Sequence, residues 1–144
     1  MKDLDFISEN GLKVLEKRYL KKDPIDAIIE TPADMFMRVV NAVSDVEKHY
    51  TKDPADLEKT KKKFTDLLFS GDFLPNSPTL MNAGREMGLL SACFVLPIED
   101  SIDSIFESIK TTALIQKAGG GTGFSFDKLR PTGDHISTSG GKTS

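Results

Sequence analysis

The sequence contains only one cysteine, no tryptophan and no long apolar run. A single cysteine cannot form an internal disulfide, which excludes a secreted domain held together by disulfide bonds. No apolar stretch approaches the roughly 20 residues that span a bilayer, and residues 1–10 alternate charged and apolar side chains instead of forming a signal peptide. We therefore expect a soluble, cytoplasmic protein with no membrane partner.

The chain also lacks an excess of either charge. Its 144 residues include 19 Lys and Arg against 22 Asp and Glu, for a formal net charge of -3. The longest basic run, residues 59–63, is interrupted by Thr60 and has Glu58 and Asp66 nearby, as on a solvated helix face. Because domains that bind nucleic acid carry a basic patch, we expect no direct nucleic-acid partner.

Glycine is scarce in the first half of the chain. Of the 11 glycines only Gly11 precedes residue 71. We therefore divide the sequence into a helical region, residues 1–70, and a second region, residues 71–144, of loops, short strands and one helix.

Apolar spacing and capping residues predict three helices in the first region. Thr31, Pro32 and Asp34 supply an N-cap, a proline at the first helical position and a first-turn carboxylate. The helices are expected at about 9–21, from 32 to about 50, and from 54 to 70. The residues expected to pack inward are Leu4, Ile7, Leu12, Leu15, Tyr19, Met35, Phe36, Val39, Val40, Val43, Val46, Leu57, Phe64, Leu67, Leu68 and Phe69.

The second region places the cysteine between a proline-rich turn and a glycine run. Residues 74–79 contain two prolines and several polar side chains, which are typical of a loop. The largely apolar residues 91–96 predict a buried strand with Cys93 inside. Any chemistry should centre on this thiol.

A helix is expected after the strand, with Asp100 as its N-cap and its end at Gly119. The glycines within 119–123 allow close approach of a ligand or positive φ, and another strand is expected at 124–126. The run is not a dinucleotide fingerprint, because Phe124 replaces a required glycine. The helix residues expected on the buried side are Ile102, Ile105, Phe106, Ile109 and Leu114.

Four segments give the second region a specific pattern in combination. They are residues 76–84, 91–97, 100–105 and 117–124, and their order and spacing closely resemble the large, catalytic subunit of ribonucleotide reductase. The adenosylcobalamin-dependent class is the most similar, and residues 12–20 and 30–36 resemble it too. A class that uses a separate radical-generating subunit stays open as the alternative. The resemblance covers essentially all 144 residues but only the family's N-terminal portion.

The resemblance implies an α/β fold, with a helical region followed by the start of a ten-stranded α/β barrel that is incomplete in this chain. It implies radical reduction of ribonucleotides to 2′-deoxyribonucleotides with adenosylcobalamin, whose binding residues lie outside this sequence. Implied partners are the remainder of the reductase in the same or a separate chain, a thioredoxin-like reductant, and a second copy bound through the helix after Asp100. No regulatory cone precedes Met1, so no overall-activity ATP site is expected.

The family also implies roles for individual residues. Cys93 matches one of two thiols that reduce the substrate and become a disulfide. Ser77 matches a hydroxyl position at the substrate phosphate, and Ala92, Gly120 and Gly121 match backbone positions that line the ribose and base.

Two further residues match the site for a deoxynucleotide or ATP effector. Asp100 would accept hydrogen bonds from the sugar or base, and Arg130 would pair with phosphate. An ordinary N-cap is the alternative reading of Asp100. No metal ligand is expected in this chain.

Two other functions stay open. The chain could be a nucleotide-binding module without catalysis that uses Asp100, Gly121 and Arg130. It could also be a small thiol enzyme with Cys93 as nucleophile and His49 or His135 as base. The expected burial of the thiol, and the absence of a supporting spacing for either histidine, argue against the thiol enzyme.

Overall fold

The computed structural model describes residues 4–86, 88–136 and 139–143. They form two compact units, Met1–Ser91 and Ala92–Ser144. The first unit is helical, and the second contains a parallel pair of strands joined by a helix. Within the described ranges, no helix has both the length and the apolar character needed to cross a membrane.

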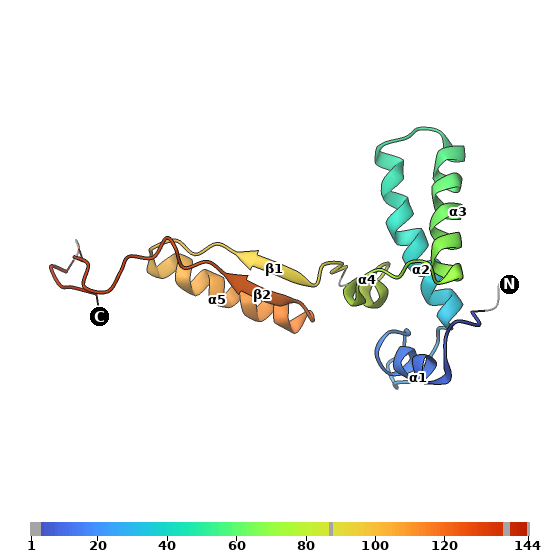
Figure 1. The fold of residues 1–144 in the computed structure, drawn as a ribbon, viewed down its shortest axis with the longest axis horizontal. Coiled ribbons are helices and arrows are strands. Elements are labelled where there is room, and N and C mark those ends of the chain that lie inside the picture. The colour runs from blue at the N-terminus through green and yellow to red at the C-terminus, as the bar shows by residue number, and fades with distance from the viewer. Residues whose placement is uncertain (1–3, 87, 137–138, 144) are drawn as a thin grey trace. The chain divides into compact units, whose positions relative to one another are not determined.

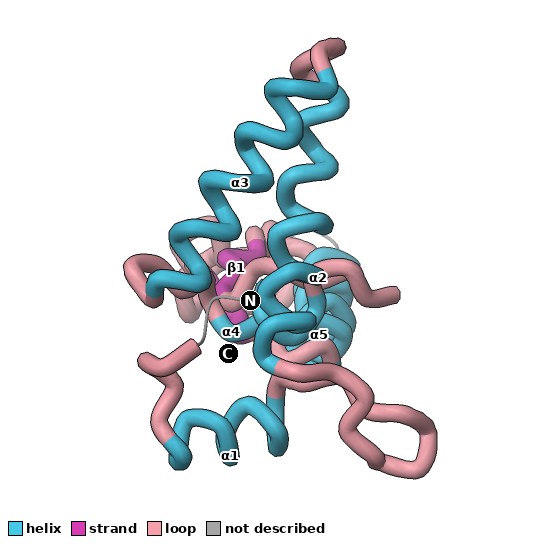
Figure 2. The backbone as a smooth tube through the Cα atoms, turned by 90° about the vertical axis from the view of Figure 1, so that its right-hand side faces the viewer, coloured by secondary structure: helices cyan, strands magenta, loops and turns pink. Residues whose placement is uncertain are grey.

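The first unit is built around two long helices that lie side by side in both views (Figures 1 and 2). Its elements are α1 (Glu9–Arg18), α2 (Pro32–Ser44), the 3-10 helix η1 (Asp45–His49), α3 (Pro54–Ser70) and α4 (Ser77–Asn82). Helices α2 and α3 form an antiparallel hairpin connected through η1.

The capping residues confirm the predicted starts of α2 and α3. Thr31 Oγ1 accepts a hydrogen bond from Asp34 N, and the Asp34 carboxylate accepts one from Thr31 N. This reciprocal arrangement satisfies donors that the first helical turn leaves free. Asp53 caps α3 by a single hydrogen bond, accepted by its Oδ1 from Ala55 N at 2.8 Å. Gly71, at φ 78°, ends the helix in the left-handed conformation.

The predicted end of α2 near residue 50 is wrong. The α-helix ends at Ser44, and the next five residues tighten into η1. Such 3-10 segments are frequent at helix ends. The change in residues per turn moves Val46 off the inward face, so that its side chain is exposed. Helix α1 also ends earlier than predicted, at Arg18.

The core of the first unit lies where α2 meets α1, α3 and α4. Its buried residues are Leu20, Met35, Phe36, Val39, Val40, Leu68, Leu80 and Ala83. Phe36 stacks on Phe6 and meets Phe69 edge to face. The prediction that Leu12 and Leu67 pack inward is wrong, because both side chains are exposed. The stripe of each helix that faces the core is narrower than the spacing of apolar residues predicts, and it leaves these two positions outside.

The loop predicted over residues 74–79 is only partly correct, because α4 begins inside it at Ser77. The Asn76 side chain accepts a hydrogen bond from Thr79 N and thereby caps the helix. Pro78 lies in the first turn, where a missing N–H costs no intrahelical hydrogen bond. Pro78 is therefore compatible with a short helix in this stretch instead of excluding one.

The second unit contains β1 (Cys93–Leu96), α5 (Ile102–Lys117) and β2 (Gly121–Phe124). The strands pair in parallel, with Cys93 opposite Gly121 and Leu96 opposite Phe124. The glycine run itself thus forms β2, and the strand predicted over 124–126 is wrong in position. The parallel pair joined by a helix is the α/β arrangement predicted for the second region.

Helix α5 is rotated relative to the prediction. Its buried position is Ser108, with Ile105, Thr112 and Ile115 half-buried along the same stripe. Ile102, Phe106, Ile109 and Leu114, predicted to be buried, are between 55% and 70% exposed. The small serine and threonine let the helix lie close to a sheet of only two strands, and the bulky residues are left on the outer side.

Candidate functional site

Cys93 is exposed in this structure, which corrects the prediction that it is buried. Side chains alternate across a strand, and in β1 Phe94 and Leu96 are half-buried whereas Cys93 and Val95 are exposed. Helix α5 covers one face of the strand pair, so the thiol lies on the uncovered face. Among the described residues no histidine is hydrogen-bonded to the thiol, so the thiol-enzyme reading gains no support.

The residues assigned to the ribose and base lie next to this thiol. Gly121 N donates a hydrogen bond of 2.7 Å to Ala92 O, and Gly121 is directly opposite Cys93 in the strand register. Ala92, Cys93, Gly120 and Gly121 thus form one continuous patch of backbone. Because three of these four residues have a very small side chain or none, a ligand could approach the main chain beside the sulphur.

Gly120 also has a packing role. A Cβ at this position would lie 2.6 Å from Ile115 Cγ2, 3.2 Å from Phe94 Cε2 and 3.3 Å from the Ile115 carbonyl oxygen. A glycine is therefore required where the chain turns from α5 into β2. By contrast, a Cβ at Gly123 would meet nothing within 4 Å.

We expect Gly120→Ala to destabilise the second unit by about 1 to 3 kcal/mol, because it overpacks the contact of α5 with β1. The measurement is native-state hydrogen exchange of the β1 and α5 amides. Gly123→Ala is the matched control and should change the opening free energy by less than about 0.5 kcal/mol. Equal effects of the two substitutions would contradict the packing role of Gly120.

Asp100 and Arg130, both assigned to the effector site, are brought together. Arg130 Nε donates to Asp100 Oδ2 over 2.6 Å, and both side chains are about one-third exposed. A second ion pair, between Lys128 and Glu99, lies beside it along the chain and raises the pKa of the lysine. These pairs join the segment after β1 to the segment after β2.

Asp100 does not cap α5, so the alternative reading of this residue is wrong. The N-cap is Ser101, whose hydroxyl accepts a hydrogen bond from Ser104 N. A serine directly before the helix satisfies that donor, which leaves the Asp100 carboxylate available to Arg130.

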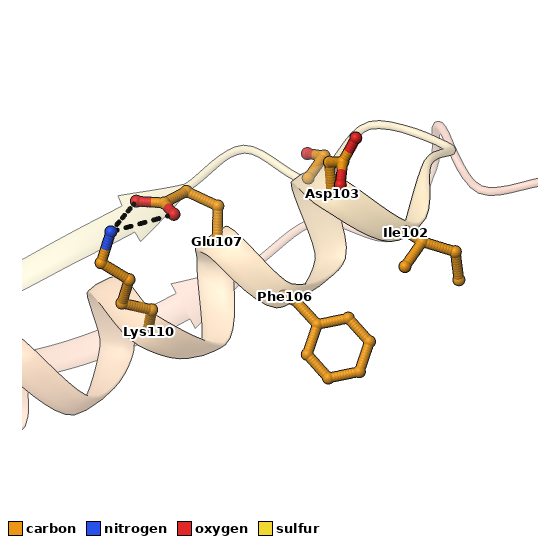
Figure 3. A pocket seen from close by; sticks show the side chains of 6 residues that line it. Ile102, Asp103, Phe106, Glu107 and Lys110 are labelled. Carbon is orange, nitrogen blue, oxygen red and sulfur yellow. Dashed lines mark hydrogen bonds and ion pairs between the residues drawn. The ribbon is translucent and has the colours of Figure 1, made fainter.

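The outer face of α5 bears an open pocket of about 740 Å³. Ile102 and Phe106 project from it into solvent, and Glu107 and Lys110 form an ion pair at its edge (Figure 3). Exposed apolar residues of this size, rimmed by charges, are typical of a surface that contacts another protein.

Ser77, assigned to the substrate phosphate, belongs to the first unit and is exposed. Its hydroxyl oxygen lies 2.9 Å from the hydroxyl of Tyr19. The serine is the first residue of α4, so the placement of this helix fixes its position.

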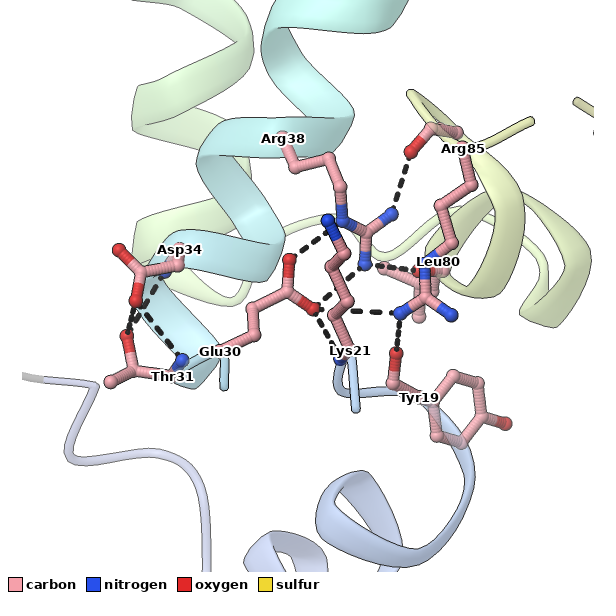
Figure 4. A network of polar contacts seen from close by, with 9 residues as sticks. Tyr19, Lys21, Glu30, Thr31, Asp34, Arg38, Leu80 and Arg85 are labelled. Carbon is pink, nitrogen blue, oxygen red and sulfur yellow. Dashed lines mark hydrogen bonds and ion pairs between the residues drawn. The ribbon is translucent and has the colours of Figure 1, made fainter. Parts of the chain in front are cut away.

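A buried polar cluster holds α4 (Figure 4). The Glu30 carboxylate accepts hydrogen bonds from Arg38 Nε at 2.7 Å, Arg38 Nη2 at 3.0 Å and Lys21 N at 2.8 Å. Arg38 also donates to the carbonyl oxygens of Leu80 and Ala83, at 3.1 and 2.6 Å. One guanidinium thus links the loop before α2 to the end of α4.

Arg85 completes the cluster. Its Nη2 donates to Tyr19 O at 2.7 Å and lies 3.6 Å from a Glu30 oxygen. Burial alone would raise the pKa of Glu30, but the hydrogen bonds from Arg38 and Lys21 N and the charges of both arginines outweigh it and lower that pKa. Desolvation lowers the pKa of Arg85.

Sequence reasoning missed this cluster. Glu30 lies directly before a helix N-cap, where a carboxylate is usually solvated, and Arg38 and Arg85 are 8 and 55 residues away, at no periodic spacing. Over the part of the chain that the structure describes, no group of three or more His, Cys, Asp or Glu side chains could hold a metal ion.

Comparison with known proteins gives two family matches in chain order. Residues 5–88 match the family described as "Ribonucleotide reductase, all-alpha domain", and residues 91–144 match "Ribonucleotide reductase, barrel domain". Together the two matches confirm the predicted fold class, a helical region followed by the start of a barrel.

Individual relatives agree with these matches. A vitamin B12-dependent ribonucleoside-diphosphate reductase of Thermoplasma acidophilum is 41% identical over 188 residues, covering 94% of this chain and 24% of the relative. One from Mycobacterium tuberculosis strain H37Rv is 43% identical over 138 residues, covering 96% of this chain and 19% of the relative. A ribonucleoside-diphosphate reductase large subunit of Trypanosoma brucei is 34% identical over 145 residues, covering 97% and 16%. The chain thus spans about a quarter or less of these relatives.

Proposed function

Because this chain belongs to the ribonucleotide reductase large-subunit family, we propose that it is the N-terminal part of a reductase that converts ribonucleoside diphosphates to 2′-deoxyribonucleotides. The observation that carries the proposal is the succession of the all-alpha and barrel matches over nearly the whole chain. The chain alone is inactive in this proposal, because the rest of the barrel and a second reducing thiol must come from the remainder of the enzyme. We place that enzyme in the cytoplasm.

Cys93 supplies one of the two thiols. Two thiols lose two electrons and two protons in forming a disulfide, and the substrate gains them as its 2′-hydroxyl leaves as water and a hydrogen takes its place. A thioredoxin-like reductant then restores the thiols by disulfide exchange. The exposed position of Cys93 on the uncovered face of β1 supports access by substrate and by a partner thiol.

The proposed nucleotide contacts come from the residues that match the family's substrate site. Ser77 donates a hydrogen bond to the substrate phosphate, and the main chain at Ala92, Gly120 and Gly121 borders the ribose and base. Gly121 opposite Cys93 supports this assignment, because no side chain obstructs the approach at that position.

Adenosylcobalamin is the proposed cofactor, since relatives from two organisms are named vitamin B12-dependent. When bound to the complete enzyme it supplies the radical that starts the reaction. The described residues offer no cluster of metal-binding side chains for its cobalt, and we assign none of them to the cofactor.

The exposed face of α5 is proposed to contact a second copy of the reductase. Its apolar side chains, Ile102, Phe106 and Ile109, recur at helical spacing and are more than half exposed. Burial of these side chains against another subunit would remove them from water.

The Asp100–Arg130 pair is the proposed effector site for a deoxynucleotide or ATP. We expect Asp100→Asn to weaken binding of dTTP to the complete reductase about tenfold, because the amide loses the charge that holds Arg130 and has an NH2 donor in place of one of the two acceptor oxygens. Isothermal titration calorimetry measures the change. Glu99→Gln, which breaks the adjacent ion pair, is the matched control and should leave the Kd within about twofold. Equal losses from both variants would contradict a specific role for Asp100.

The experiment that tests the function is conversion of CDP to dCDP by the complete reductase containing this sequence, with and without adenosylcobalamin. Turnover that requires the cofactor supports the proposal. Binding of dTTP without any turnover would instead support a nucleotide-binding module without catalysis, the alternative that the paired Asp100 and Arg130 favour.

A further inference from the structure

The hydroxyl of Tyr19 meets the hydroxyl of Ser77 across 58 positions of sequence. The two oxygen atoms are 2.9 Å apart, a normal hydrogen-bond distance. Tyr19 is the C-cap residue of α1, and Ser77 is the first residue of α4. The contact therefore joins two elements of the first unit at the residue assigned to the substrate phosphate.

Both ends of this contact are held by the buried cluster. On the tyrosine side, Arg85 Nη2 donates to the Tyr19 carbonyl oxygen at 2.7 Å (Figure 4), and the residue packs against the core beside buried Leu20. On the serine side, Arg38 donates to two carbonyl oxygens of α4 and its C-cap. Glu30 pairs with Arg38 and lies close to Arg85, which couples the two anchors.

The distance fits a hydrogen bond in either direction, but the two directions differ in chemistry. A hydroxyl has one donor hydrogen and two acceptor lone pairs. If Tyr19 donates to Ser77 Oγ, the serine hydrogen remains free to donate to an anionic oxygen, and the first bond strengthens the second. If Ser77 donated to the tyrosine, it could no longer donate to a phosphate.

We propose that Tyr19 is a positioning residue for Ser77: it donates its hydroxyl hydrogen to Ser77 Oγ, and so holds the serine ready to donate to the phosphate of the nucleotide substrate. This inference rests on the proposed role of Ser77. The rotamer of an exposed serine is otherwise free, and fixing it before binding removes an entropic cost from the complex. Tyr19 itself does not touch the substrate.

The test uses Tyr19→Phe in the complete reductase, with Tyr50→Phe as the matched control. Phenylalanine keeps the ring packed on the core and removes only the hydroxyl. Tyr50 is the only other tyrosine of the chain, and its side chain is 82% exposed. We expect Tyr19→Phe to raise the Kd for CDP by about three- to tenfold and to raise KM in parallel with little change in kcat. Tyr50→Phe should change neither constant.

A double-mutant cycle with Ser77→Ala distinguishes the positioning role of Tyr19 from the phosphate-binding role of Ser77, on which it rests. Tyr19→Phe should have no further effect on the Kd once Ser77→Ala has already raised it. If Ser77→Ala raises the Kd but Tyr19→Phe does not, the positioning role is overturned while the role of Ser77 stands. If Ser77→Ala leaves the Kd unchanged, both are overturned. An equal effect of Tyr19→Phe in either background would make it a general packing effect and would also overturn the inference.

Discussion

Replacing Cys93 with serine is expected to reduce turnover of ribonucleotide to deoxyribonucleotide by at least about a thousandfold, the scale of loss when a group that reacts directly is removed. A serine hydroxyl has nearly the same shape as the thiol but cannot form the disulfide that delivers two electrons. The measurement is deoxynucleotide formation by the complete reductase over many turnovers with a thioredoxin-like reductant.

The expected loss is chemical, so binding should survive it. The Kd for CDP should stay within about threefold, because the substitution changes one side-chain atom and leaves the backbone patch of Ala92, Cys93, Gly120 and Gly121 intact. Val95→Ala is the matched control. Val95 lies on the same face of β1 as Cys93, two residues later, and its side chain is 82% exposed. Activity retained by Cys93→Ser, or lost equally by Val95→Ala, would contradict the redox role.

The second large effect concerns stability. We expect Glu30→Gln to lower the free energy of unfolding of the first unit by about 2 to 3 kcal/mol, because it leaves the charges of Arg38 and Arg85 without a buried counter-ion. The Glu30 side chain is 6% exposed and that of Arg38 13%. Urea unfolding followed by circular dichroism measures the change.

Glu9→Gln is the matched control, because it breaks an ion pair of the same length that is exposed to solvent. Its ion pair with Lys13 is 2.7 Å long, like that of Glu30 with Arg38, but its side chains are 84% and 59% exposed. Loss of a solvated pair should cost less than about 1 kcal/mol. Similar losses in the two variants would show that burial of the cluster contributes nothing.

The cluster should also respond to acid. The pKa of Glu30 in the folded chain is below its ordinary value of 4.5, so its contribution to stability is fully present above pH 4.5. It is lost as the pH falls through the lower, folded-state pKa. The difference in unfolding free energy between the wild type and Glu30→Gln should therefore shrink as the pH is lowered below 4.5. A difference independent of pH would contradict an ionised Glu30.

Local chemistry explains why the helix starts could be predicted from the sequence. At Thr31 and Asp53 the cap, the proline and the acidic residue lie within four positions of each other, so the interactions that begin the helix are all readable in one short stretch. The strand at Cys93 and the end of α3 at Gly71 could be predicted for the same reason, because neighbouring residues in the sequence determine each of them.

The face of α5 that packs on the strands could not be predicted from local sequence. Its apolar residues cover more than one face, and the sequence does not say which stripe meets the sheet. The choice is made by contacts with β1 and β2, where small side chains such as Ser108 fit, and this leaves Phe106 outside. The same tertiary choice exposes Cys93, because α5 covers only the opposite face of β1.

The cluster around Glu30 was unpredictable for a different reason. Its partners come from the loop after α1, from α2 and from the turn after α4, so no window of sequence contains them together. The contact between Tyr19 and Ser77 is equally distant. Cys93 could be singled out from the sequence pattern itself, whereas Ser77 could be proposed only through the family resemblance.

The bond between Tyr19 and Ser77 has an optical consequence. The chain contains no tryptophan to dominate its ultraviolet emission, and one of its two tyrosines is the residue whose hydroxyl meets Ser77. Tyrosine emission is sensitive to the hydrogen bonding of the phenol. The chain thus contains an intrinsic fluorophore at the proposed phosphate contact, and Tyr50→Phe would leave Tyr19 as its single reporter.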